Sequence, residues 1–361
     1  MPGMIVAPQP LAVEEGAKVL ASGGNAFDAA LTAAIVQGVI DPHSCGIGGY
    51  MVMTSWKAGQ KDPLPIIDAP ALAGSRVSAD MWKEIVIGPN PRGWGFFLKG
   101  KVNEDGYLSI CIPGMVRGLE AVHKRWCTKS WSELFEPAVK TAHEGWMLTT
   151  SYANRWKEPP MYYEGSSAFQ KLHVTPDARK IFLKEDGSVY EAGETLRNPD
   201  YGRSLERIAQ NGPDEFYTGE LGQQIAADLQ ANDSWVTADD LADYEIREES
   251  PVVSTYRDYT IVSNQAPHGG PTLAALILTG RKGGVVAVKS LLRKLLIWRV
   301  PIIWYGFAFL APILVVALAV PFSGFRFAFA DFDPWPGLSN AAQSQANQFG
   351  LTANNIRHAS F

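Results

Sequence analysis

The stretch DPHSCGIGGYMVMTSW, Asp41 to Trp56, decides how the rest of this sequence is interpreted. An apolar segment of helical character, Asn25 to Ile40, runs into Asp41-Pro42, where proline cannot continue a helix. Three glycines follow, Gly46, Gly48 and Gly49. They allow the backbone either a positive φ or a close approach to another segment or a ligand. The apolar run Tyr50 to Trp56 then predicts a buried strand. The stretch predicts a helix-to-strand elbow, and alone it does not separate a structural turn from a functional loop.

Length and composition place the chain among globular proteins. Its 361 residues are 46% hydrophobic and 19% charged, enough for one large domain or two smaller ones. Thirty-seven acidic residues against 32 basic ones leave a net charge of −5. No basic stripe with interleaved aromatics occurs before residue 280, so we expect no nucleic-acid partner.

The three cysteines, Cys45, Cys111 and Cys127, form no CxxC motif and have no histidine at metal spacing. We therefore expect buried free thiols, and neither a metal nor another cofactor. Cys45 is nearest to the glycine loop, but no basic partner that would activate it as a nucleophile is evident. The first residues lack the pattern of a signal peptide. The compartment stays open between the cytoplasm and a membrane.

Helices are predicted from their start and stop signals. Pro10 in a first turn and Gly23-Gly24 beyond the last delimit a helix over Pro10 to Ala21. Asn25 can cap the next helix, whose small residues predict a narrow face that packs closely. Capping or breaking signals predict further helices after Pro113-Gly114, Ser130-x-x-Glu133, Asn198-Pro199 and Thr237-x-x-Asp240.

Strand signals are fewer. Besides Tyr50 to Trp56, the segments Leu64 to Ile67 and Tyr107 to Ile112 are strand-like. Pro251 to Thr255 and Tyr259 to Asn264 predict a hairpin, although its turn lacks the usual Asn-Gly. The pattern alone indicates a mixed α/β protein with apolar strands and covering helices.

Few polar side chains suggest a site. The carboxylates Asp239, Asp240 and Asp243 fit a first helical turn, where acids complement the helix dipole, and we do not interpret them as metal ligands. His43 adjoins the glycine loop, and His268 precedes Gly269-Gly270. Both could line a pocket and contact a substrate, the competing interpretation being a structural histidine with satisfied hydrogen bonds.

A family resemblance rests on several of these segments. GGNAFDAALTAAIVQGVIDPHSCGIGG, from Gly23, resembles the large-subunit signature of the γ-glutamyltranspeptidases (glutathione hydrolases), a branch of the N-terminal-nucleophile hydrolases. YLSICIPGMVRGLEAVHKRW, from Tyr107, and the run from Asn198 to Glu245 are also similar, and NQAPHGG, ending at Gly270, is the last match. The resemblance implies an α/β (α+β) protein with the α/β/β/α sandwich of that fold, incomplete because residues 1–280 match the large subunit alone.

The resemblance also implies a chemistry. Family members transfer or hydrolyse γ-glutamyl amides such as glutathione through a threonine that begins the small subunit. No comparable threonine followed by an apolar strand occurs after Gly280, and Thr149-Thr150 fits a helix edge. We therefore expect a chain that is inactive alone and needs a small-subunit domain as partner. Whether it acts as an enzyme at all is left open.

The sequence also differs from the family at the arginine that binds the substrate. In the family an Arg-x-x-Ala-Pro-like motif grips the substrate α-carboxylate. Alignment on Ala69-Pro70 places Ile66 or Ile67 there, and ungapped alignment from ADMW places Leu72. Arg76 is the only guanidinium nearby, and a substrate-binding role and a plain surface role both remain open. The missing arginine favours an alternative, an acylase of the same fold acting on a non-glutamyl amide.

The composition changes after Gly280. Residues 281–330 are first basic, then strongly apolar, and residues 300–322 carry no charge over 23 positions, where a bilayer needs about 20. A transmembrane helix with its basic flank in the cytoplasm is one interpretation. A buried apolar insertion and sequence foreign to the family, such as a gene-model artefact, are the others. The polar tail 331–361 is expected to be disordered. A non-catalytic, membrane-associated remnant is therefore another functional alternative.

Overall fold

The computed structural model describes residues 3–90, 95–160, 165–256 and 259–265, all of which belong to the unit Met1–Lys294. His268, Gly269 and Gly270 lie outside the described residues, as do the predicted transmembrane helix 300–322 and the tail 331–361. The pocket role of His268, the transmembrane helix and the disordered tail therefore stay predictions. Within the described ranges, no helix combines the length and the apolar character needed to cross a bilayer.

The first two helices begin and end where their signals predict. α1 spans Pro10–Ala21 and α2 spans Ala26–Ile40. The Asn25 side chain accepts the N–H groups of Phe27 and Asp28, and the Asp28 carboxylate accepts the N–H of Asn25 in return. The expected narrow packing face is wrong, because α1, α3 and α4 all pack on α2 and bury most of its circumference.

Several of the remaining helices begin at a side-chain cap. The Ser130–Glu133 capping box opens α4, and Gly145, with φ of 96°, ends it. The Thr237–Asp240 box opens α11. Their bounds are α3 (Met115–Trp126), α4 (Trp131–Glu144), α5 (Thr150–Arg155), α6 (Ala168–Lys171), α7 (Pro176–Phe182), α8 (Pro199–Asn211), α9 (Asp214–Tyr217), α10 (Glu220–Ala231) and α11 (Ala238–Ala242). Short 3-10 turns occupy Lys83–Ile85, Lys99–Lys101 and Tyr107–Ser109.

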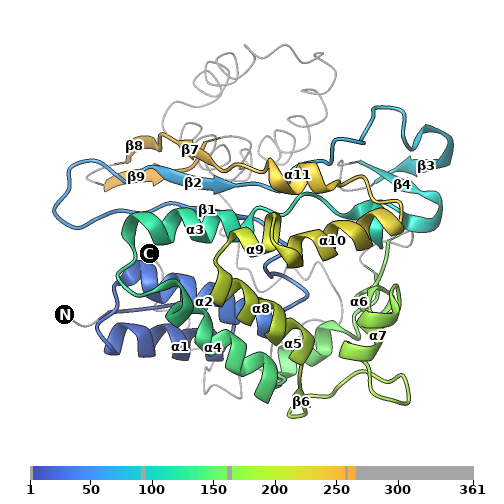
Figure 1. Cartoon of the computed structure of the whole chain (residues 1–361), viewed down its shortest axis with the longest axis horizontal. Helices are drawn as coiled ribbons and strands as arrows, with labels where there is room; N and C mark the ends of the chain where they lie inside the picture. Colours follow the sequence, from blue (N-terminus) through green and yellow to red (C-terminus); the bar gives the residue numbers. More distant parts are fainter. Residues whose placement is uncertain (1–2, 91–94, 161–164, 257–258, 266–361) are drawn as a thin grey trace, which may run out of the picture. The chain divides into compact units, whose positions relative to one another are not determined.

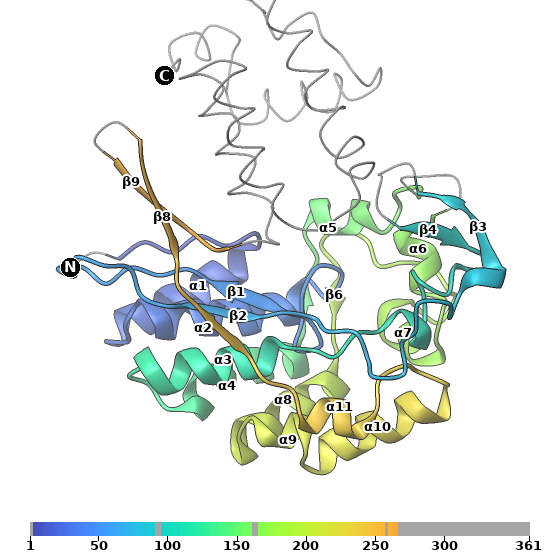
Figure 2. The ribbon, with the colours of Figure 1, turned by 90° about the horizontal axis from the view of Figure 1, so that it is seen from above.

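A three-stranded antiparallel sheet has the order β1-β2-β7. Its strands are β1 (Met51–Met53), β2 (Ile66–Ala69) and β7 (Arg247–Glu249), with Asp68 opposite both Val52 and Arg247. The predicted hairpin is confirmed as β8 (Val252–Tyr256) and β9 (Tyr259–Ser263), and Figure 2 shows it extending past the helices. The other pairs are β3 (Val86–Pro89) with β4 (Phe96–Leu98), and β5 (Trp146–Met147) with β6 (Thr195–Leu196).

Two strand predictions are wrong. Of Tyr50 to Trp56 only Met51–Met53 pairs within the described residues, and Tyr50 and Trp56 are 66% and 46% exposed. Among those residues, β1 has β2 as its one neighbour in the sheet. Tyr107–Ser109 forms a 3-10 turn, since both the N–H and the hydroxyl of Ser109 donate to the carbonyl of Gly106. In that segment, Ile112 alone pairs with another described residue, Leu72.

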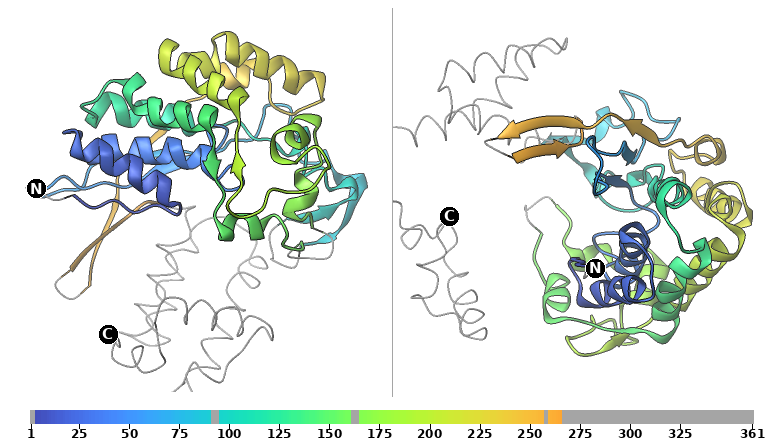
Figure 3. Two further views of the ribbon diagram at one scale, coloured as in Figure 1. Left: turned by 90° about the horizontal axis from the view of Figure 1, so that it is seen from below. Right: turned by 90° about the vertical axis from the view of Figure 1, so that its left-hand side faces the viewer.

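The described residues form a sheet layer covered on one face by a helical layer (Figures 1 and 3). α3 contacts the sheet directly through β1 and β2. A Cβ on Gly118 would lie 2.5 Å from Met51 Cγ and 2.9 Å from Ala69 Cβ, so glycine permits this close packing. Ile67 of β2 joins the core with residues of α2 and α3, whereas its neighbour Ile66 is buried outside that cluster. The mixed α/β class is confirmed.

Candidate functional site

Two tyrosines distant in sequence hold the glycine loop, Asp41 to Gly49. The Ile47 N–H donates to the hydroxyl of Tyr201 on α8 at 3.2 Å, and the His43 N–H donates to the hydroxyl of Tyr152 on α5 at 3.3 Å. Burial raises the pKa of Tyr201 to about 12, despite its bond to Ile47, so the hydroxyl stays neutral. Sequence reasoning missed both tyrosines, because such a residue on an amphipathic helix resembles ordinary core.

At Gly38 and Gly49 the absent side chain permits a close approach to Gly46. Gly46, Gly48 and Gly49 are absent from the glycines with positive φ. A Cβ on Gly38 would lie 3.1 Å from Gly46 Cα, and a Cβ on Gly49 would lie 3.1 Å from the Gly46 carbonyl oxygen. The Gly49 carbonyl accepts the N–H groups of both Gly114, at 2.9 Å, and Met115, at 3.0 Å. The loop therefore joins the end of α2 to the start of α3.

The burial of the three thiols differs from the expectation at one cysteine. All three are free, but Cys111 is exposed, because the segment around it forms no continuous strand. Cys45 is half-buried, and burial, with the charge of Asp41, raises its pKa to about 11. Burial and Asp28 raise the pKa of Cys127 to about 12. Both thiols are protonated at neutral pH, which leaves Cys45 without the thiolate that a nucleophile requires.

His43 lies at the surface of the glycine loop. Partial burial and the positive charge of Arg155 lower the pKa of its imidazole, so the ring is neutral at pH 7. Among the described residues only its backbone N–H forms a hydrogen bond, so the ring nitrogens are not structurally engaged there. His43 does not line the pocket that contains Arg76.

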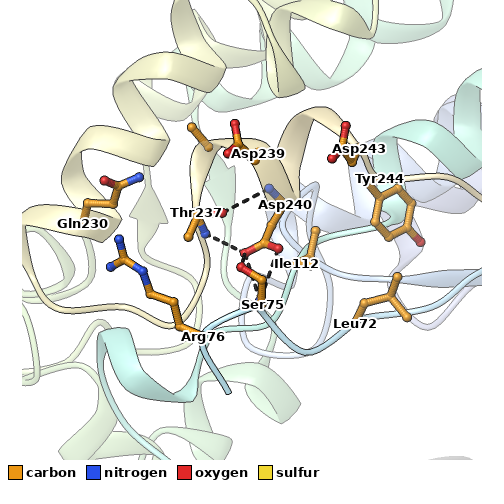
Figure 4. A pocket seen from close by; sticks show the side chains of 11 residues that line it. Leu72, Ser75, Arg76, Ile112, Gln230, Thr237, Asp239, Asp240, Asp243 and Tyr244 are labelled. Atoms are coloured by element: carbon orange, nitrogen blue, oxygen red, sulfur yellow. Dashed lines mark hydrogen bonds between the residues drawn. The ribbon is translucent and has the colours of Figure 1, made fainter. Parts of the chain in front are cut away.

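That pocket lies between the loop after β2 and helices α10 and α11, and its volume is about 650 Å³. It therefore has the size of a small-molecule site. Figure 4 shows the loop on one side and the helices on the other. Its lining consists of Leu72, Ser75, Arg76, Ile112, Gln230, Thr237, Ala238, Asp239, Asp240, Asp243 and Tyr244.

Asp240 joins the two sides of this pocket. Its carboxylate accepts the N–H of Ser75 at 3.0 and 3.2 Å, the Ser75 hydroxyl at 3.1 Å and the Thr237 N–H at 2.8 Å. Burial alone would raise its pKa, but these hydrogen bonds outweigh it and hold the pKa of Asp240 below its usual value. The carboxylate is thus charged and fully engaged in holding the loop to α11.

The apolar side chains of the pocket, Leu72, Ile112 and Tyr244, belong to segments that hydrogen bonds also fix in place. Leu72 and Ile112 exchange two backbone hydrogen bonds, of 3.3 and 2.8 Å. The Tyr244 hydroxyl donates to the Pro70 carbonyl at 2.7 Å. Burial, with the nearby charge of Asp68, raises the pKa of Tyr244 to about 12, so it remains a donor. The start of the loop is therefore anchored to the segment that follows α11.

The other charged side chains that line the pocket make fewer hydrogen bonds and ion pairs than Asp240 does. Arg76 is exposed, and its backbone N–H donates to the Trp235 carbonyl at 3.4 Å. Within the part of the chain that the structure describes, its guanidinium has no hydrogen bond or ion pair, and neither have the side chains of Asp239 and Asp243. No group of three potential metal ligands occurs among the described residues.

Comparison with known families gives a match over most of the chain. The model of the family described as gamma-glutamyltranspeptidase matches residues 12–287. Glutathione hydrolase 3 of Arabidopsis thaliana is 30% identical over 281 residues, which are 76% of this chain and 39% of that protein. A glutathione hydrolase proenzyme of Pseudomonas sp. (strain A14) is 32% identical over 78% of this chain and 45% of its own length. The chain thus spans less than half the length of these relatives.

Solved structures agree with the sequence matches. Helicobacter pylori gamma-glutamyltranspeptidase superimposes with a TM-score of 0.67 at 31% identity, covering 77% of this chain and 74% of that one. The Pseudomonas nitroreducens gamma-glutamyltranspeptidase complexed with L-DON gives 0.65 at 28% identity, with coverage of 77% and 76%. A cephalosporin acylase from Bacillus halodurans gives 0.58 at 26% identity, with coverage of 70% and 44%.

Proposed function

Because the chain belongs to the gamma-glutamyltranspeptidase family, we propose that it supplies the large-subunit-like part of an enzyme that transfers or hydrolyses γ-glutamyl groups. Its fold is that of the N-terminal-nucleophile hydrolases. The match of residues 12–287 to the family is the observation that carries the proposal. Glutathione or another γ-glutamyl amide is the proposed substrate, and residues 1–280 are the proposed family domain.

The catalytic threonine is proposed to belong to a small-subunit domain, on the same polypeptide or on another. The chain corresponds to 39–45% of the length of its relatives, and no threonine-led apolar strand is recognisable in sequence after Gly280. Thr149 has a structural task, since its hydroxyl accepts the Tyr152 N–H at 3.3 Å and caps α5. We therefore propose that the 361 residues form no acyl-enzyme unless a small-subunit domain is supplied.

Substrate contacts are proposed for Arg76, His43 and His268. Arg76 supports this role because its guanidinium faces a pocket and lacks a partner among the described residues. The uncommitted ring nitrogens of His43 support a weaker role beside the glycine loop. His268 rests on its place in the HGG segment alone.

An acylase of the same fold is the second candidate. At the position of the family's arginine, Ile66 and Ile67 are both fully buried in β2, so neither position offers a donor for a substrate carboxylate. The likeness to the cephalosporin acylase supports this candidate. A membrane-associated remnant that only binds is the third, and it depends on residues 300–322.

A direct assay separates these proposals. The purified chain, incubated with a chromogenic γ-glutamyl anilide, should show neither turnover nor self-cleavage, and Thr149→Ala should not change this result. The transcript across the codons for Gly280 to Arg326 should be sequenced, and any threonine-led domain that follows should be co-expressed. Restored γ-glutamyl turnover then supports the first candidate, and turnover of only non-glutamyl amides supports the acylase. A covalent adduct of a γ-glutamyl affinity label on the lone chain would contradict the requirement for a partner.

A further inference from the structure

The hairpin of β8 and β9 leaves apolar side chains exposed on both of its faces. Val252 and Val253, consecutive in β8, are 46% and 52% exposed, and Ile261 of β9 is 37% exposed. Successive side chains of a strand point to opposite faces, so neither face is closed off from solvent. Figures 2 and 3 show the hairpin extending beyond the helices. Its apolar surface is therefore open to contact with another polypeptide.

The backbone of the hairpin is also suited to further pairing. β8 and β9 form five consecutive pairs, from Val252 opposite Ser263 to Tyr256 opposite Tyr259, without a register shift. In the described part of the chain, no third strand pairs with either of them. The N–H and C=O groups along such a regular edge are a template for an added strand.

The other strands of this chain carry features that discourage such an addition. β7 consists of Arg247, Glu248 and Glu249, all charged. β3 contains Pro89 and has a register shift against β4. The strands β1, β4, β5 and β6 have only two or three residues each. By contrast, β8 and β9 read VVSTY and YTIVS, with no charge and no proline. Charge, proline, irregularity and shortness are the usual protections of an edge, and among the described strands this pair lacks them.

We infer that the hairpin is a self-association surface, on which a second copy of this chain pairs its own β8 with β8 of the first. The edge of β8 is the more accessible one, because Val252 to Thr255 are all exposed, whereas Val262 and Ser263 of β9 are half-buried. A two-fold axis perpendicular to the strands makes the two copies of β8 antiparallel. Their valines and threonine then face one another, and β-branched side chains favour such cross-strand pairs.

A second copy fits this edge for two further reasons. A two-stranded hairpin is marginally stable in water, whereas three or more strands with an apolar face are stable, and two paired hairpins make a four-stranded sheet. Neither strand is charged, so identical copies do not repel each other at the contact. The edge is five residues long, which places the dimer in the small and weak class of interfaces. Pairing needs neither a substrate nor a nucleophile, so the inference does not rest on the proposed reaction.

The first test is sedimentation velocity of the full chain in mild detergent, over a hundredfold range of concentration. The dimer fraction should rise with concentration. Val253→Lys should weaken dimerisation about tenfold or more, because a lysine on an edge opposes strand addition. Val86→Lys on β3 is the matched control, since Val86 is also an exposed hairpin valine, at 44%, and it should not change the dimer fraction. Both variants should keep the melting temperature of the parent chain.

A cysteine scan then locates the contact without adding a charge. In a chain with Cys111→Ser, each residue from Val252 to Thr255 is replaced in turn by cysteine and the protein is oxidised. Only a side chain next to the two-fold axis lies close to its own copy, so the disulfide-linked dimer should peak at one or two positions. Val86→Cys should give only background.

Three results would overturn the inference. They are a chain that stays monomeric over the whole range of concentration, a Val253→Lys variant that dimerises like the parent, and an even yield of disulfide across the scan. Hydrogen exchange identifies the alternative occupant. Protection of the β8 amides in a monomer would show that another segment of the same chain covers the edge, and would equally overturn the proposal of a second copy.

Discussion

The backbone N–H and the hydroxyl of Ser75 both donate to the carboxylate of Asp240, 165 residues further along the chain. This contact joins the loop that follows β2 to the first turn of α11. It places Arg76 beside the acidic residues of α11 and so creates the pocket (Figure 4). The sequence indicates a capping role for Asp240 and no role for Ser75.

The contact between Ser75 and Asp240 should make the free energy of unfolding depend on pH. Hydrogen bonds hold the pKa of Asp240 below its usual value, so its contribution is present above the unfolded pKa of about 3.9 and is lost as the pH falls further. At pH 7, Asp240→Asn should lower the free energy of unfolding by about 1–2 kcal/mol. Urea denaturation at pH 7, 5 and 3 should show this difference shrinking at the lowest pH. Asp239→Asn is the control, and parallel losses for both variants would contradict the assignment.

The buried capping box of α2 should be far more costly to disturb than an exposed one. Asp28 is fully buried and accepts the N–H groups of Asn25, Thr128 and Lys129 as well as the Thr128 hydroxyl. Asp28→Asn should lower the free energy of unfolding by about 3 kcal/mol or more, because several donors lose a charged acceptor. Glu133→Gln, in the exposed box of α4, should cost much less, because water can replace the lost contacts. Equal losses in urea denaturation would refute the role given to burial.

Two glycines should respond very differently to replacement by alanine. A Cβ on Gly114 would lie 2.1 Å from the Tyr244 hydroxyl and 2.5 Å from the Ala69 carbonyl oxygen, whereas Gly48 has open space. Gly114→Ala should destabilise the protein by about 3 kcal/mol or more, since the backbone must move. Gly48→Ala should be nearly neutral. Adding Tyr244→Phe to Gly114→Ala should not restore the melting temperature, because the clash with Ala69 remains. Full rescue would show that the hydroxyl alone causes the strain.

The three thiols should react at different rates. Cys111 is exposed, whereas the raised pKa of Cys45, about 11, leaves about one thiolate in a thousand at pH 8. Iodoacetamide at pH 8 should therefore modify Cys111 first and Cys45 and Cys127 slowly, as measured by peptide mass spectrometry. In urea the three rates should converge. Fast modification of Cys45 in the folded protein would revive the nucleophilic role that its surroundings argue against.

The local signals in the sequence predicted α1 to α4, α8 and α11, whereas no prediction was made for α6 and α7. Asn25, Ser130 and Thr237 cap the helices they were expected to cap, because a cap is a contact between residues three positions apart. Family-like segments also predicted the mixed α/β fold correctly. Tyr50 to Trp56 was misjudged because an apolar run does not specify whether a neighbouring strand exists on each side.

The sequence by itself thus determined the family and the ends of the helices whose caps it signals, since each depends on adjacent residues. Tertiary structure alone decided that Tyr152 and Tyr201 hold the glycine loop and that Ser75 meets Asp240. Those contacts join residues more than a hundred positions apart, and periodicity carries no information about such pairs. A pocket built from them becomes visible only when the packed core has brought its walls together.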